Sequence, residues 1–280
     1  MQRARGSLSL LGFAAISASL AVGCSSSSAP KETDDSVSLA QDGTDVNDIE
    51  SQSSALTAAF TLGTGDFTHP AASVKAAANV AGFFTPQSCI TTDADVGALS
   101  VKYTLSGCTG PWGLVRVSGI VSVTYASSTD GLALDVTGTS LEFDTSRASH
   151  GKASLHAAAT ATSHGGAREM KWNATLDGTT ARGNAFARTA DWDVQWQVGQ
   201  SCIALDGTAQ GQVKGRVLNS HVSNYKRCQG ECPAAGGEIT ISNEVGQEVS
   251  LTFDGSATAT FTDASDRETR IDLACGIGGT

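Results

Sequence analysis

The sequence predicts an all-β protein, an antiparallel β-sandwich or a set of curved, open-barrel sheets, with a short N-terminal helix and disulfide bracing. Apolar and polar residues alternate with a period of two over most of the chain after residue 97, which is typical of strands with one solvated face. Asp-Gly pairs between such runs favour tight hairpin turns. Six cysteines follow residue 53, an even number that suits disulfides in an exported chain.

Residues 1–23 have the layout of a signal peptide. Arg3 and Arg5 form a basic start, and an uncharged, mainly apolar run follows over residues 8–22. This run is shorter than the ~20 residues that a helix needs to cross a bilayer. We therefore expect export and cleavage just before Cys24.

The stretch Ala21-Val22-Gly23-Cys24 resembles the lipobox of bacterial lipoproteins, with the usual leucine displaced one place to Leu20. The resemblance implies that Cys24 carries a diacylglyceryl thioether and an acylated amine, so the membrane is the expected partner. Serine rather than aspartate after Cys24 resembles the outer-membrane pattern of some bacteria. The alternative is an ordinary secretory signal with cleavage elsewhere.

The segment 24–52 is expected to be a flexible, acidic tether that lifts the body off the membrane. Seven carboxylates between residues 31 and 50 face only Lys31, and low hydrophobicity with like charges favours an extended chain. Without residues 1–23, the chain has 16 basic and 28 acidic side chains, a formal charge near −12. Such a body should not bind nucleic acid by charge.

Residues 53–280 are expected to form the β-rich domain, preceded by one helix over 70–81 that Pro70 can start. A change of alternation phase places a bulge or turn near Gly138. The alternative is two β subdomains that meet near Gly165. Strands are expected at 99–105, 115–125, 132–143, 151–162, 168–176, 182–189, 191–198, 207–217, 237–242, 247–254, 257–262 and 268–275, with Asp-Gly turns at 130–131, 177–178 and 254–255.

Three disulfides are expected among Cys89, Cys108, Cys202, Cys228, Cys232 and Cys275. Cys89 and Cys108 flank one strand and are predicted to pair. The other four then pair among themselves, with Cys228–Cys232 and Cys202–Cys275 as one arrangement. A metal site at Cys228 and Cys232 lacks the further ligands that zinc needs, so no metal or cofactor is expected.

Trp192 and Trp196 lie on one face of a predicted strand, with carboxylates on the other face. If exposed, these two rings would be a platform for sugar rings; otherwise they belong to the core. His150, His156 and His164 match no familiar ligand spacing and are expected to be surface residues. Asp42, Asp45 and Asp48 lack the spacing of a calcium loop and are interpreted as linker charge.

The glycine and cysteine pattern also resembles β-rich lipoproteins of myxobacteria and similar Gram-negative bacteria. The residues that carry this resemblance are Gly107-Cys108-Thr109-Gly110, Val117 to Val123, Tyr225 to Cys228, Cys232-Pro233 and Gly236-Gly237. It implies architecture and location, not activity. With no catalytic motif, a structural or adhesive cell-envelope role is expected. The alternatives are a binding module for a carbohydrate or an apolar ligand, and a hydrolase.

Overall fold

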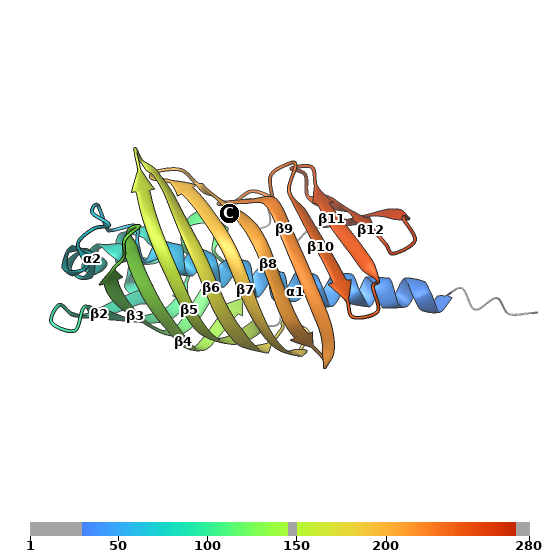
Figure 1. The fold of residues 1–280 in the computed structure, drawn as a ribbon, viewed down its shortest axis with the longest axis horizontal. Helices are drawn as coiled ribbons and strands as arrows, with labels where there is room; N and C mark the ends of the chain where they lie inside the picture. The colour runs from blue at the N-terminus through green and yellow to red at the C-terminus, as the bar shows by residue number, and fades with distance from the viewer. Residues whose placement is uncertain (1–29, 145–149, 273–280) are drawn as a thin grey trace, which may run out of the picture.

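The computed structural model describes residues 30–144 and 150–272, and it confirms the mostly antiparallel β architecture (Figure 1). Thirteen strands form one open sheet in which strands pair in chain order from β1 to β13. The strands are β1 (Ile90–Asp95), β2 (Ser100–Cys108), β3 (Arg116–Ser127), β4 (Leu132–Asp144), β5 (His150–His164), β6 (Ala167–Thr179), β7 (Ala185–Gln197), β8 (Cys202–Val213), β9 (Arg216–Cys228), β10 (Glu238–Asn243), β11 (Glu248–Phe253), β12 (Thr258–Thr262) and β13 (Glu268–Asp272).

A 30-residue helix, α1 (Pro30–Ala59), packs against the inner face of this sheet. In Figure 1 it runs behind the central strands, across their direction, and its N-terminal end extends past β12. It contacts every strand from β4 to β11, so the sheet curves around it. The helix is therefore part of the core of the molecule.

The prediction of a flexible tether is wrong for the described part of that segment, residues 30–52. From Ser36 onward most residues of α1 are buried, although the helix has no apolar stripe. Its buried polar residues are Ser36, Asp42, Asn47, Glu50, Ser51, Gln52, Ser53, Ser54 and Thr57. Hydroxyl groups find acceptors within the helix, since Ser53 donates to the carbonyl of Ile49 at 2.8 Å and Thr57 to that of Ser53 at 2.9 Å. Carboxylates find partners on the sheet instead.

The helix expected over 70–81 is present in two parts. An α-helical segment, α2 (Pro70–Ala76), starts at its proline and continues into a 3₁₀ segment (Ala77–Phe83). Val74 and Val80 are buried against the core. Short 3₁₀ turns follow at Gln87–Cys89 and Pro111–Gly113.

Several strand boundaries differ from the prediction. The predicted pair 182–189 and 191–198 is one strand, β7, because inward and outward residues alternate without a break. The predicted strand 207–217 instead contains the turn between β8 and β9, where Lys214 and Gly215 have φ of 54° and 76°. Neither β1 nor the greater part of β9 is predicted.

Two of the three expected Asp-Gly turns are present, and Gly178 shows why the third is not. Gly131 and Gly255 lie in hairpin connections, whereas Gly178 lies inside β6. A Cβ atom at Gly178 would be 1.9 Å from the carbonyl oxygen of Lys152, so glycine is required there by the close approach of β5. The expected bulge near Gly138 is confirmed as a register shift between Gly138 and Leu141.

The sheet shows no division near Gly165. Strands β5 and β6 form a hairpin around Gly165 and pair along their whole length, from His164–Ala167 to Lys152–Thr179. Exposed charged residues lie on both edge strands, with Asp93 and Asp95 on β1 and Glu268 and Arg270 on β13. Charge on an edge strand disfavours pairing with another chain.

Candidate functional site

A buried ion pair joins α1 to the centre of the sheet. Nε of Arg188 on β7 donates to Oε1 of Glu50 at 2.6 Å, and both side chains are fully buried. Arg188 also donates to the carbonyl oxygen of Leu218 at 3.2 Å and to the hydroxyl of Ser220 at 2.8 Å. Burial raises the pKa of Glu50, while the guanidinium of Arg188 opposes this rise. The pair therefore fixes α1 to β7 and β9 together.

A second group of ion pairs surrounds Asp42, whose side chain is 1% exposed. Its Oδ2 accepts from Nη2 of Arg216 at 2.6 Å. Its Oδ1 accepts from Nδ2 of Asn184 at 3.0 Å and lies 3.2 Å from Nζ of Lys214. Three hairpin residues thus hold one helix carboxylate.

Asp45 and Asp48 also form ion pairs, with arginines of the β-sheet and its loops. Oδ2 of Asp45 lies 3.3 Å from Nε of Arg182, and Oδ1 of Asp48 lies 3.4 Å from Nη2 of Arg227. The interpretation of these two residues and Asp42 as linker charge is therefore wrong. The three-residue spacing of Asp42, Asp45 and Asp48 is close to one turn of α1 and does not match a metal-binding loop.

A buried arginine lies at the C-terminal end of α1. Nη1 and Nη2 of Arg168 donate to the carbonyl oxygens of Thr61 at 2.9 Å and Thr64 at 2.6 Å. Its guanidinium also lies 4.9 Å from the ring centre of Phe67. A cation near a helix C-terminus interacts favourably with the exposed carbonyls and the helix dipole. Burial lowers the pKa of Arg168 from its usual value.

The sequence reasoning missed these arginines, although two of them carry a detectable signal. Arg188 is in phase with the buried residues Phe186 and Ala190, and Arg168 is in phase with the buried Met170. A cation on the apolar face of a predicted strand requires a buried partner. That partner is Glu50 of α1 for Arg188, and the turn that follows α1 for Arg168.

Trp192 and Trp196 are core residues, so their interpretation as core is confirmed and the alternative of an exposed sugar platform is wrong. They are 1% and 3% exposed. Trp192 packs edge-on against Trp172 at 6.1 Å, and Trp196 lies 5.7 Å from Trp112. The apolar face of β7 is directed toward α1, and its aromatic rings fill the space between sheet and helix.

Two buried tyrosines lie near the C-terminal end of α1. The hydroxyl groups of Tyr103 and Tyr125 are 3.2 Å apart, and the ring of Tyr103 stacks on Phe60 at 4.2 Å. Burial raises the pKa of Tyr125 to about 12 and also raises that of Tyr103. Both phenols therefore stay protonated and support packing.

The predicted disulfide Cys89–Cys108 is present, with Cα atoms 5.3 Å apart. The arrangement with Cys228–Cys232 and Cys202–Cys275 is wrong, because Cys202 bonds to Cys228 directly across β8 and β9. Cys232 is disulfide-bonded as well. Cys24 and Cys275 lie outside the described residues.

The three histidines of β5 lie on the outer face of the sheet. His150, His156 and His164 are exposed, and His150 pairs with Asp144. Within residues 30–144 and 150–272, one group of three potential metal ligands occurs: Cys202, Cys228 and Glu231. Its two sulfur atoms are bonded to each other, so they are not free to ligate a metal.

The outer face of the sheet is hollowed into a groove of ≈ 750 Å³ that crosses seven strands, from β5 to β11. We call this hollow the outer groove. Its side chains are those of His156, Ala158, Asn173, Thr175, Thr189, Asp191, Thr208, Gln210, Asn219, His221, Thr240, Ser242 and Glu248. A second hollow of ≈ 500 Å³ over β3 to β6 shares Ala158 and Asn173 with it.

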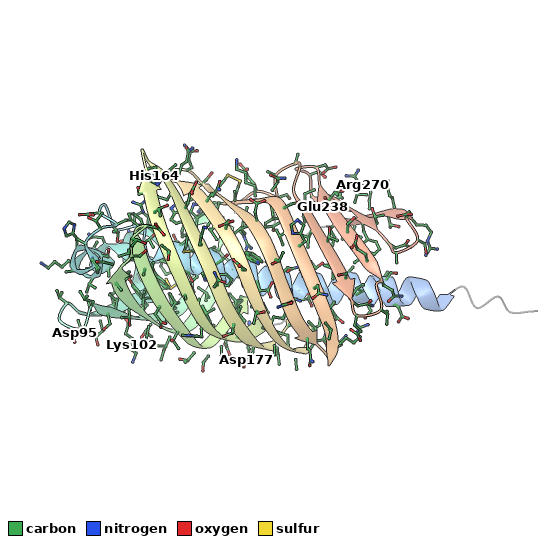
Figure 2. All side chains as sticks on the ribbon, in the orientation of Figure 1. Asp95, Lys102, His164, Asp177, Glu238 and Arg270 are labelled. Carbon is green, nitrogen blue, oxygen red and sulfur yellow. A yellow bond between two sulfur atoms is a disulfide. The ribbon has the colours of Figure 1, made fainter. Side chains whose placement is uncertain are left out.

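Strand register arranges these side chains in two adjacent rows. In one row Asn173, Asp191, Thr208 and His221 lie opposite one another on successive strands. The neighbouring row contains Thr175, Thr189, Gln210 and Asn219 in the same order. Figure 2 shows the side chains of this face, with His164 and Asp177 marking its opposite rims.

No family model, curated protein or solved structure matches this chain. None of the helices in the described part of the chain is long and apolar enough to span a membrane. The sequence resemblance to lipoproteins therefore stays a prediction.

Proposed function

We propose that this chain is a lipid-anchored cell-envelope protein with a structural or adhesive role and no catalytic activity. Its anchor is Cys24, and its localisation is the outer membrane, on the periplasmic or surface side. The proposal rests on the lipobox-like sequence and on a disulfide-braced body. Disulfides suit an oxidising compartment such as the periplasm or cell surface.

The absence of catalytic activity is proposed because the buried ionisable groups with shifted pKa values have structural roles. Glu50 holds α1 in the sheet, Arg168 holds the turn that follows α1, and Tyr103 and Tyr125 are a buried pair. These four buried groups, whose pKa values are shifted, do not line the outer groove. Catalytic groups are usually shifted and gathered in a cleft, whereas these support packing.

The short distance from the anchor to α1 changes the expected placement of the body. Only six residue steps separate Cys24 from Pro30, where α1 begins, and a fully extended chain of that length spans at most about 20 Å. The body is therefore held close to the bilayer, at the N-terminal end of α1. A tether running to residue 52 would have allowed a much larger separation.

Replacing the proposed anchor tests this function. In membrane fractionation of the producing bacterium, the unmodified protein should sediment with membranes and the Cys24→Ser variant should not. Two acyl chains or more hold a protein stably, because each buried methylene contributes only about 0.8 kcal/mol. Mass spectrometry should find the lipid mass on Cys24. An unlipidated chain that still begins at Met1 would contradict the proposal.

A further inference from the structure

We infer that the outer groove binds a neutral oligosaccharide chain, laid across the strands from β5 to β11. This inference deepens the proposed adhesive role by naming the class of ligand. It rests on the shape of the groove, on the kinds of side chain that line it, and on the lack of internal partners for Asn173, Asp191 and His221.

The groove has the dimensions of a site for a chain molecule. Its lining crosses seven neighbouring strands, which lie about 4.8 Å apart, so its length is about 29 Å. Short side chains such as Ala158, Thr189 and Thr208 form much of its floor and let a ligand approach the sheet closely. A chain of several sugar units fits this length better than a single small molecule.

The lining offers hydrogen bonds of both kinds with little charge. Amides of Asn173 and Gln210 can donate and accept, threonine hydroxyls can do the same, and the carboxylate of Asp191 accepts. No lysine or arginine lines the groove, and the chain as a whole is acidic, so an anionic polymer would be repelled. Sugar hydroxyls are neutral and both donate and accept, which matches this lining.

The key groups of the groove are free for a ligand. Asn173, Asp191 and His221 make no side-chain hydrogen bond or ion pair with any described residue, although they lie in one row. Elsewhere on the outer face charged residues do pair, as Lys152 does with Glu142 at 2.7 Å. The hydrogen-bonding groups of these three side chains are therefore available to a ligand on the outer face of the sheet.

A cation is the less suitable occupant. The two carboxylates of the groove, Asp191 on β7 and Glu248 on β11, are four strands apart, which is about 19 Å. They cannot converge on one ion or on one compact ammonium group. Recognition therefore depends on hydrogen bonds spread along the groove, since the groove side chains include no phenylalanine, tyrosine or tryptophan ring.

The test is calorimetric titration of the full chain carrying Cys24→Ser with two neutral probes, chitohexaose and cellohexaose. We expect at least one to bind, and Asp191→Ala to weaken that binding about tenfold or more, because a hydrogen bond to a charged group contributes about 1.5–3 kcal/mol. The matched control is Asp193→Ala, two residues along the same exposed face and outside the groove. It should leave binding unchanged.

Two results would overturn the inference: no heat of binding for either hexasaccharide at millimolar concentration, or equal binding by the Asp191→Ala and Asp193→Ala variants. Both substitutions are on solvent-exposed positions, and circular dichroism would verify that each variant is folded. Failure here is separable from failure of the proposed anchor, because the titrated chain lacks the lipidated residue.

Discussion

Replacing Glu50 by leucine should lower the free energy of unfolding by about 3–5 kcal/mol, because it leaves the guanidinium of Arg188 buried without its counter-ion. The remaining acceptors, the carbonyl of Leu218 and the hydroxyl of Ser220, carry no negative charge. Urea unfolding followed by tryptophan fluorescence measures the loss.

The double variant Glu50→Leu with Arg188→Met is the matched control. Replacing both partners of a buried ion pair by apolar residues of similar size is often neutral or stabilising. We therefore expect the double variant to regain most of the stability that the single variant loses. A single variant as stable as the unmodified protein would mean that the helix does not pack on β7.

Replacing Trp192 by alanine should cost a similar amount, about 3–5 kcal/mol, because a buried indole is removed and a cavity remains between sheet and helix. The neighbouring ring of Trp172, 6.1 Å away, would lose its edge contact. Denaturant unfolding again gives the value, and the midpoint should fall without a change in slope.

Two controls separate packing from a ligand role for Trp192. Its Nε1 has no hydrogen-bond partner among the described residues, so Trp192→Phe should cost far less than alanine. Val198 follows β7 and is 54% exposed, so Val198→Ala should change stability by less than about 0.5 kcal/mol. If Trp192→Ala unfolded like the unmodified chain, the indole would have to lie at the surface.

The β pattern of this protein was predictable from local sequence because each strand has one buried and one solvated face. Alternation located most of the strands, and the phase change near Gly138 located a bulge. Asp-Gly pairs predicted two turns correctly. The turn predicted at Gly178 is wrong, because glycine also occurs where two backbones approach closely. An Asp-Gly pair alone does not show whether its glycine is needed for a turn or for a close approach of two strands.

Helix α1 was not predictable by the same reasoning, because its residues do not form an apolar stripe. Its carboxylates are compatible with burial only through partners more than one hundred residues away, such as Arg188 for Glu50 and Arg216 for Asp42. The local sequence therefore resembles a solvated linker. Arginines in the buried phase of β6 and β7 are the signal that points to a polar element inside the sheet.

The disulfide between Cys202 and Cys228 was not predicted because the hairpin formed by β8 and β9 was not recognised in the sequence. Once a turn at Lys214–Gly215 joins β8 to β9, the two cysteines become directly opposite residues. Reading 207–217 as a single strand hid this relation. The outer groove was likewise not predictable from local sequence, because its two rows form only when four successive strands, β6 to β9, are in register.

Amide hydrogen exchange over residues 36–59 decides whether the acidic segment is a core helix. Strands and helices of a core exchange only through large-scale opening, whereas an extended chain exchanges at the rate of an unfolded peptide. We expect amides near Glu50 to be protected as strongly as those of β7, whose residues they contact. Exchange of this segment at unfolded rates, while β7 stays protected, would contradict the placement of α1 within the sheet.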